Sequence, residues 1–247
     1  MMRVMLWAMV AILLYSHAWG GALEEQMFAS IANNEAETVA ALLGKGADLH
    51  ALDERNQGPL TAAARLGHLE TVRVLISHGA EVNRTSHLGT PLLVAAINGR
   101  NPVVKELLAN GANVNHVEWA GFTALLAAAA SGHMETVRIL LDNGAGLDWR
   151  DITGSTALLW AVQAPQGAGT VALLLERGAG INSTDQYRNS PLAVSVLGEK
   201  PDMVKVLLEH GADANGQFGD GGSLLAEAIN RKNEIIAALL REAGAKN

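Results

Sequence analysis

The residue types that could carry out chemistry are spread thinly along this chain, without the spacing of a known site. There are eight histidines and no cysteine. His68 and His133 follow a glycine in similar turns, where we expect them to have a capping role, and His17 lies near the amino terminus. The other histidines lie singly in loops. Because no HExxH or paired-histidine motif occurs, the sequence predicts no metal site.

Three other stretches have the outline of a chemical motif, and each lacks something that the motif requires. Residues 213–220 resemble a calcium-binding loop, but Phe218 stands where that loop needs glycine and Leu224 where it needs a bidentate glutamate. The Gly-Ala-Gly segments at 144–146 and 178–180 follow expected helices rather than strands, so they do not form dinucleotide-binding turns. No GxSxG or P-loop motif occurs. We therefore expect no cofactor and no enzymatic activity.

The glycines instead mark a repeat that organises the chain. A Gly-Ala pair recurs with spacings of 33, 32, 33, 34, 33 and 33 residues. Its glycines are Gly46, Gly79, Gly111, Gly144, Gly178, Gly211 and Gly244. Such a period is typical of stacked helical repeats, in which each copy buries its apolar face against its neighbours. The sequence predicts an all-α solenoid.

Residues 118–148 are the clearest copy and predict two short helices. Leu125, Ala128 and Ala129 share one face of the first helix, which Gly132 ends. Gly144 stands where a left-handed cap is needed after the second helix. We expect the inner side of that second helix to be lined by Met134, Val137, Leu140 and Leu141. Its charged residues point outward: Glu135, Arg138 and Asp142.

Several short motifs are similar to those of the ankyrin repeat. They are Gly67-His68, residues 72–75, residues 79–83 (GAEVN) and residues 89–92 (GTPL). The resemblance extends from residue 22 to 245 and divides the chain into seven copies, at about 22–51, 52–84, 85–116, 117–149, 150–183, 184–216 and 217–247. It implies stacked helix–turn–helix units with protruding β-hairpin loops, and a non-enzymatic protein that binds another protein.

The chain differs from the family in two respects. The family's histidine after its Pro-Leu pair is replaced by Thr61, Leu93, Leu126, Leu159 and Ala193. The hydrogen bond of that histidine is lost, and we expect apolar packing to replace it. The turns between the helices of the fifth and sixth copies are also altered, at residues 164–169 and 198–201. They alone support the alternative of an enzyme or a small-molecule binder, and loop variation explains them more simply.

The first twenty residues have the three parts of a secretory signal peptide. Arg3 provides a positive start, residues 4–15 form an uncharged run, and Ala18 and Gly20 precede a cleavage site expected after Gly20. A membrane-spanning helix needs roughly 20 apolar residues, so we expect cleavage rather than a retained anchor. The mature chain, residues 21–247, then resembles exported bacterial ankyrin-repeat proteins of the periplasm. A secreted, a leader-anchored and a cytoplasmic protein are the alternatives.

The candidate binding residues are aromatic residues and arginines of the predicted loops. In ankyrin-like arrays the partner usually meets these loops and the inward side of the first helices. Five of the seven aromatic residues after the leader fall in the loops. Since interface hot spots favour Trp, Tyr and Arg, we expect a partner to bind Trp119, Phe122, Trp149, Arg150, Trp160, Tyr187 and Arg188. The alternative is that some of them pack onto their own copies, as is common at positions like those of Phe122 and Trp149.

The charge and the resemblance together predict a monomeric protein-binding module. The net charge of −7, without a basic stripe, argues against nucleic-acid binding and would speed the approach of a basic partner. An inhibitor or immunity protein against a toxin fits this prediction. An accessory protein that supports a periplasmic enzyme or an envelope complex fits equally well.

Overall fold

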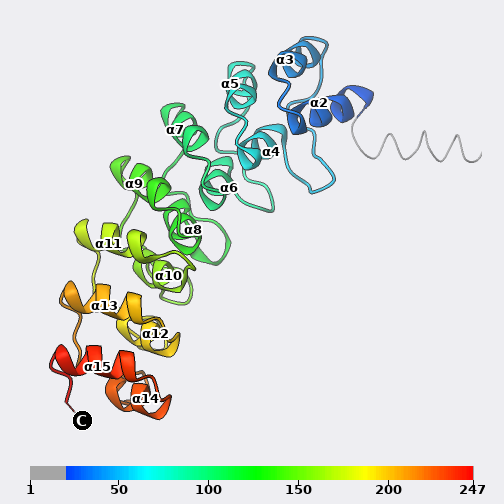
Figure 1. The fold of residues 1–247 in the computed structure, drawn as a ribbon. Coiled ribbons are helices and arrows are strands. Elements are labelled where there is room, and N and C mark those ends of the chain that lie inside the picture. The colour runs from blue at the N-terminus through cyan, green and yellow to red at the C-terminus, as the bar shows by residue number, and fades with distance from the viewer. Residues whose placement is uncertain (1–20, 247) are drawn as a thin grey trace, which may run out of the picture. The chain divides into compact units, whose positions relative to one another are not determined.

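The computed structural model describes residues 21–246, and Figure 1 labels its helices. The predicted signal peptide, residues 1–20, lies outside the described residues. Within 21–246 there are 14 α-helices, one 3-10 helix and no strand, only two isolated antiparallel bridges. The predicted all-α class is therefore confirmed. None of the helices in this part of the chain is both long and apolar enough to cross a membrane.

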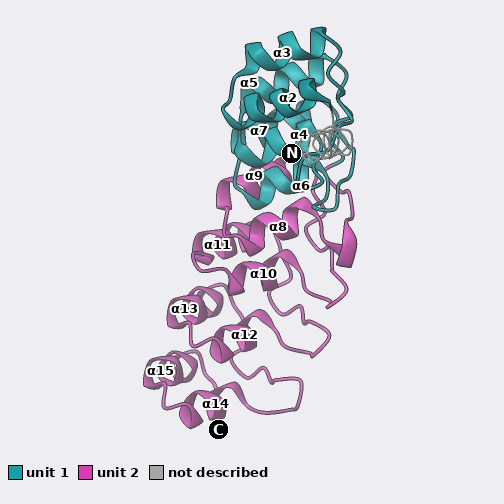
Figure 2. Cartoon of the chain, turned by 90° about the vertical axis from the view of Figure 1, so that its right-hand side faces the viewer, with its two compact units in different colours: residues 1–113 teal, residues 114–247 magenta. Residues whose placement is uncertain are grey.

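The chain divides into two compact units, with the boundary between Asn113 and Val114 (Figure 2). Unit 1 contains three pairs of an inner and an outer helix: α2 (Ala22–Ala32) with α3 (Ala36–Gly44), α4 (Pro59–Leu66) with α5 (Leu69–Ser77), and α6 (Pro91–Ile97) with α7 (Asn101–Ala109). The inner helices α2, α4 and α6 pack side by side, and so do the outer helices α3, α5 and α7. Each pair therefore covers the apolar face of the next.

Unit 2 repeats this arrangement with four pairs. They are α8 (Ala124–Ala130) with α9 (Met134–Asp142), α10 (Ala157–Gln163) with α11 (Ala168–Glu176), α12 (Pro191–Leu197) with α13 (Pro201–Glu209), and α14 (Leu224–Asn230) with α15 (Glu234–Glu242). The inner helices α8, α10, α12 and α14 form one row and the outer helices another (Figure 1). The short 3-10 helix η1 (Trp119–Gly121) precedes α8.

Small residues and side-chain caps explain why such short helices form. In α8 six of the seven residues are buried, all of them alanine or leucine, and Thr123 caps the helix by accepting the Leu126 N–H. Equivalent caps are made by Thr90, Thr156, Ser190 and Ser223. The residues that replace the family's histidine are at most 4% exposed, so packing takes its place as expected.

The turn within a helix pair connects that pair to the one before it. Its residues donate to carbonyl oxygens near the end of the preceding inner helix: His68 to Ile31 (2.7 Å), Arg100 to Arg65 (3.1 Å), and Lys200 to Val162 (2.9 Å) and Gln163 (2.8 Å). These carbonyl groups have no partner within their own helix. His68 thus caps the end of α2, whereas neither His68 nor His133 makes a side-chain cap bond to the helix that follows it.

The buried side of α9 is wider than the predicted stripe. Met134, expected inside, is exposed, whereas Thr136 and Ile139 are buried beside Val137 and Leu140. The reason is that α9 packs against both α8 and α11. Contacts on two sides bury more than one stripe of a helix, and they leave its first residue, Met134, at the surface.

A recurring asparagine connects successive Gly-Ala loops. Asn115 Nδ2 donates to Gly144 O (3.0 Å), and its Oδ1 accepts from Gly146 N (2.8 Å). Asn83 and Asn215 make the same pair of bonds with the loops that follow them. Because a side-chain amide donates and accepts at once, it can satisfy both backbone groups of the next loop.

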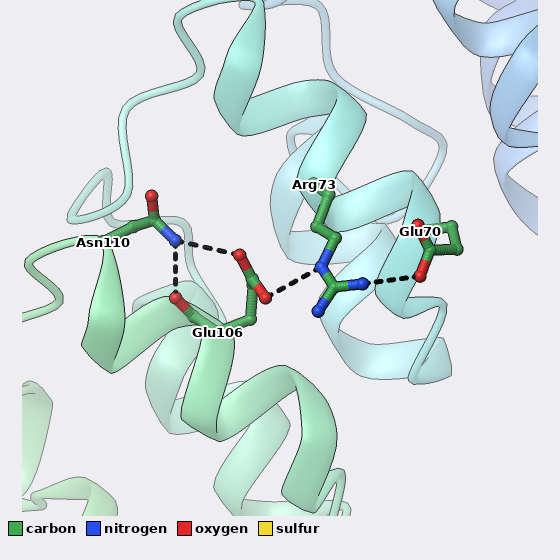
Figure 3. Close-up of polar contacts among 4 residues, drawn as sticks. All are labelled: Glu70, Arg73, Glu106 and Asn110. Carbon is green, nitrogen blue, oxygen red and sulfur yellow. Dashed lines mark hydrogen bonds and ion pairs between the residues drawn. The ribbon is translucent and has the colours of Figure 1, made fainter.

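Ion pairs connect neighbouring outer helices at the surface. Arg73 of α5 lies 2.8 Å from Glu70 and 2.9 Å from Glu106 of α7, and Asn110 donates to Glu106 (Figure 3). The hydrogen bond and the charge of Glu106, followed by those of Glu70, raise the pKa of Arg73 above its ordinary value. Exposed pairs of this kind add little stability, so the fold depends mainly on the packed helix rows.

Candidate functional site

The candidate residues lie on or beside three hairpin loops of unit 2. Each loop is closed by a backbone bond: Glu118 N to Phe122 O (2.8 Å), Asp151 N to Ser155 O (3.2 Å) and Asp185 N to Asn189 O (3.1 Å). In the second and third loops the aspartate Oδ1 also accepts two backbone N–H groups of its own loop. The loops are therefore held in shape by their own polar groups.

Backbone contacts join the tips of these loops to one another. Ile152 N donates to Ala120 O (3.0 Å), and Gln186 N donates to Thr153 O (2.8 Å). The left-handed backbone of Gly121 (φ +78°) lets the first tip come close to Asp151, where a Cβ would lie 3.0 Å from the Asp151 Cα. The three tips thus form one hydrogen-bonded series.

Three of the predicted aromatic residues form a cluster. The rings of Trp119 and Phe122 stack with 6.3 Å between their centroids, and Phe122 meets Trp160 of α10 edge to face at 5.3 Å. Trp119 is 71% exposed, whereas Phe122 and Trp160 are half-buried. Trp119 therefore offers its surface to solvent, while Phe122 packs against its ring and Trp160 packs against Phe122.

Asp151 is the support that sequence reasoning missed. It is 7% exposed, and its Oδ2 accepts from Trp160 Nε1 (2.9 Å). Its Oδ1 accepts from Thr153 N (2.8 Å), Thr153 Oγ1 (2.6 Å) and Ser155 N (3.0 Å). A buried carboxylate needs such donors to offset its desolvation. Asp151 therefore fixes the second loop and the Trp160 ring together.

Trp149 and Arg150 connect the loops as well as being exposed. Trp149 is 41% exposed, and its Nε1 donates to Gly121 O (3.0 Å) in the preceding loop. Arg150 Nη1 donates to Gly154 O (2.8 Å) and to Thr184 O (2.7 Å). Trp149 therefore packs against the preceding loop with one edge of its ring and remains partly exposed.

Tyr187 and Arg188 lie at the third tip. Tyr187 is 67% exposed, Arg188 is exposed, and Arg188 has a left-handed backbone (φ 64°). Within the described residues neither ring contact nor ion pair involves them. Ile152, at the second tip, is 73% exposed and was not among the predicted residues. The sequence could have identified Ile152 as a tip residue, because it occupies the same position in its copy as Trp119 does in the preceding copy. We call Trp119, Ile152, Tyr187, Arg150 and Arg188 the tip surface.

The altered turns of the fifth and sixth copies have structural roles. A Cβ on Gly167 would overlap the Ala161 carbonyl oxygen, so the first turn needs glycine there. In the second turn Lys200 donates to the end of α10. These contacts account for both turns without a ligand. Among residues 21–246 no group of three or more His, Asp or Glu side chains is placed to hold a metal ion.

A cavity of about 260 Å³ lies in unit 1. Its lining combines His50, Arg84 and His87 with apolar residues such as Leu49, Pro59 and Pro91. Arg84 Nη1 donates to His50 Nδ1 (2.6 Å). This bond connects two copies at the position where His50 replaces the recurring asparagine.

Comparison with known proteins agrees with this architecture. The family described as ankyrin repeats (3 copies) matches residues 27–118, 115–185 and 164–247. The crystal structure of the human ASB11 ankyrin repeat domain superposes with a TM-score of 0.79 at 24% identity, over 90% of this chain and 98% of that one. This likeness shows the fold.

Relatives among characterised proteins match over shorter stretches. Ankyrin repeat domain-containing protein 13B of mouse and human is 44% identical over 54 residues, 22% of this chain and 9% of the relative. The mouse B-cell lymphoma 3 protein homolog is 41% identical over 76 residues, 30% of this chain and 17% of the relative. The chain thus spans less than a fifth of these proteins.

Ankyrin repeats are protein–protein interaction modules, and proteins built from them are generally non-enzymatic. The family match extends over nearly all of the described residues, and the paired helices follow the same plan from α2 to α15. The chain belongs to the ankyrin-repeat family.

Proposed function

We propose that this chain is an exported, monomeric protein-binding module that holds a protein partner on the tip surface of unit 2. The observation that carries the proposal is the exposure of three large apolar side chains at successive loop tips. Trp119, Ile152 and Tyr187 are 71%, 73% and 67% exposed. Side chains of this kind gain most when a partner covers them, and Trp and Tyr are enriched in binding hot spots.

The size of this surface supports specific binding. A large aromatic side chain buries about 150–250 Å² when it is fully covered. Two-thirds of that area, at about 25 cal/mol per Å², corresponds to roughly 2–4 kcal/mol for each side chain. Part of this free energy offsets the cost of association. The half-buried Phe122 and Trp160 extend the apolar surface behind Trp119.

The test is capture of the partner by the tagged mature protein and by a double variant. We expect Trp119→Ala with Tyr187→Ala to abolish capture and to leave thermal stability nearly unchanged, because both side chains are mostly exposed. Ile235→Ala is the matched control, since Ile235 is 64% exposed on the outer helix α15. Equal capture by the double variant and the parent protein would contradict the proposal.

Trp149 calls for a separate variant. Its Nε1 bond to Gly121 connects two loops, so Trp149→Ala should lower stability by roughly 1–2 kcal/mol as well as weaken binding. Urea unfolding measures the first effect and capture the second. An unchanged unfolding midpoint would mean that the Trp149 bond contributes nothing to the fold.

Export is proposed from the composition of residues 1–20 and from the resemblance to exported bacterial ankyrin-repeat proteins. We expect the protein isolated from its own cells to begin at Gly21 and to lie in the periplasm. The mass of the intact protein and its recovery with the periplasmic fraction measure both points. A chain that retains Met1 would instead support an anchored or cytoplasmic protein.

Within this function we propose stoichiometric inhibition, as by an immunity protein that neutralises a toxin. Supporting this role, helix pairs fill the described residues, so binding is the contribution that this part of the chain makes. The captured partner, mixed with an equal amount of the mature protein, should lose its activity. Unchanged or raised activity would support an accessory role instead.

A further inference from the structure

We propose that the partner presents a basic and apolar protein segment to unit 2, and that a lysine or arginine of this segment pairs with Asp148. The inference rests on the function proposed above and assigns a chemistry to the partner of the tip surface. The net charge of −7 would steer any basic protein toward the chain. The residues around the tips identify the carboxylate that would bind its charge.

The loops around the tip surface are negatively charged. They contain two guanidinium groups, those of Arg150 and Arg188, and five carboxylates. The carboxylates are those of Glu118, Asp148, Asp151, Asp185 and Asp220. Three of them accept backbone N–H groups, and such hydrogen bonds favour the charged form of a carboxylate. Charges close to an interface decide which partner approaches and fits, so these loops favour a basic segment.

Asp148 occupies the position of the recurring asparagine. Four other copies have asparagine there, namely Asn83, Asn115, Asn182 and Asn215. Each of these side chains bonds to the Gly-Ala loop that follows it. Asn115, for example, donates to Gly144 O (3.0 Å) and accepts from Gly146 N (2.8 Å). A carboxylate has no donor for the carbonyl oxygen, so Asp148 cannot replace this pair of bonds.

The fold does not use the Asp148 carboxylate. Asp148 is exposed, and within the described part of the chain its side chain makes neither a hydrogen bond nor an ion pair. Arg150, two residues away, donates to Gly154 O and Thr184 O instead. The exposed carboxylate of Asp148 is therefore available to a cation of the partner.

The neighbours of Asp148 suit a basic side chain. Trp149 follows it directly, is 41% exposed, and donates from Nε1 to Gly121 O (3.0 Å). This bond brings Trp149 to the loop that contains Trp119, which is 71% exposed. Exposed indole rings attract cations over their faces and can cover the apolar stem of lysine or arginine. A segment that combines such residues with apolar ones therefore matches both the carboxylate and the rings.

The test uses a displayed library of short random peptides, selected on the mature protein. We expect the enriched peptides to combine lysine or arginine with aromatic or aliphatic residues. A synthetic peptide of the best sequence should bind roughly two- to fivefold more weakly to Asp148→Asn, because an exposed ion pair is lost. Asp148→Glu keeps the charge and should recover most of this affinity. The affinity should also fall as the salt concentration rises.

The stability of Asp148→Asn separates partner binding from a structural role. The new amide can bond to Gly178 O and Gly180 N of the next loop, as the asparagines of other copies do at the equivalent positions. We therefore expect an equal or higher urea midpoint together with weaker peptide binding. A lower midpoint would mean that Asp148 supports its own loop, and would overturn its assignment to the partner.

A matched control and the double variant complete the test. Glu242→Gln removes the same single charge from the outer helix α15 and should leave peptide binding unchanged. Equal weakening by this control, enriched peptides that are acidic or uncharged, or equal binding by Asp148→Asn would overturn the basic partner. The proposed function would stand if binding still required Trp119 and Tyr187. No enrichment, or equal binding by the Trp119→Ala and Tyr187→Ala double variant, would overturn both.

Discussion

Replacing Asp151 by asparagine should loosen the support beneath the tip surface while preserving the shape of the side chain. The carboxylate accepts four hydrogen bonds, three on Oδ1 and one on Oδ2. Asparagine keeps one oxygen for the first three. Its NH₂ group would face the Trp160 N–H, so that two donors meet and the indole loses its acceptor.

The expected loss of stability follows from these bonds. An unsatisfied buried donor costs roughly 1–3 kcal/mol, and a hydrogen bond to a neutral acceptor contributes less than one to a charged acceptor. Asp151 is 7% exposed, but Trp160 is only half-buried, so water can reach part of its ring. We therefore expect unit 2 to lose about 2 kcal/mol of its unfolding free energy.

Urea unfolding followed by tryptophan fluorescence measures this loss in the right part of the chain. All three tryptophans of the described residues, Trp119, Trp149 and Trp160, lie in unit 2. For a urea dependence of roughly 1–3 kcal/mol per molar, a loss of about 2 kcal/mol lowers the midpoint by about 1 M. The indole N–H resonance of Trp160 should shift as well.

Asp185→Asn is the matched control. Asp185 occupies the same position of the next loop, and its Oδ1 accepts two backbone N–H groups, which an asparagine oxygen can also accept. We expect a loss below about 1 kcal/mol for this variant. If Asp151→Asn costs no more than Asp185→Asn, the bond to Trp160 does not stabilise the loop and the reasoning above is wrong.

Three further substitutions test one contact between copies and two glycine positions, each by thermal unfolding followed by circular dichroism. Lys200→Met should cost roughly 1–2 kcal/mol, since the carbonyl end of α10 loses its ammonium donor. Gly167→Ala should cost roughly 1–3 kcal/mol, because a Cβ there would overlap the Ala161 carbonyl oxygen. Gly44→Ala, at a helical position with open space around it, should instead stabilise the protein by roughly 0.5–1 kcal/mol.

The repeat could be predicted because its signals are local. Gly144 recurs where the chain must turn left-handed after the outer helix, and its backbone has φ +84°. Thr123 likewise caps α8 from a position that directly precedes the apolar run. Each of these features is decided within a few residues, so the sequence displays the glycine at every copy and the capping residue at five of the seven.

The contacts between copies could not be predicted in the same way. Phe122 and Trp160 are 38 positions apart, and whether they touch depends on how neighbouring copies stack. His68 was expected to cap, but its partner, the Ile31 carbonyl oxygen of the preceding copy, could not be read from the local pattern. Asp151 reads as an ordinary polar loop residue, because its burial results from the approach of Trp160 and the adjacent hairpin loop. These roles depend on contacts between residues far apart in the sequence, and the local pattern of a single sequence does not predict such contacts.

The exposure of the tip residues has a physical basis in the hydrogen bonds between loops. Ile152 N and Gln186 N both donate to the preceding tip, so the backbone that presents Ile152 and Tyr187 is fixed before a partner arrives. Exposed apolar side chains on a flexible loop could fold back onto their own copy. Here the backbone hydrogen bonds between the tips restrict that conformational change. A partner would then meet an ordered surface and avoid much of the entropy cost of ordering a loop. Breaking one of these bonds should therefore weaken binding more than it weakens the fold.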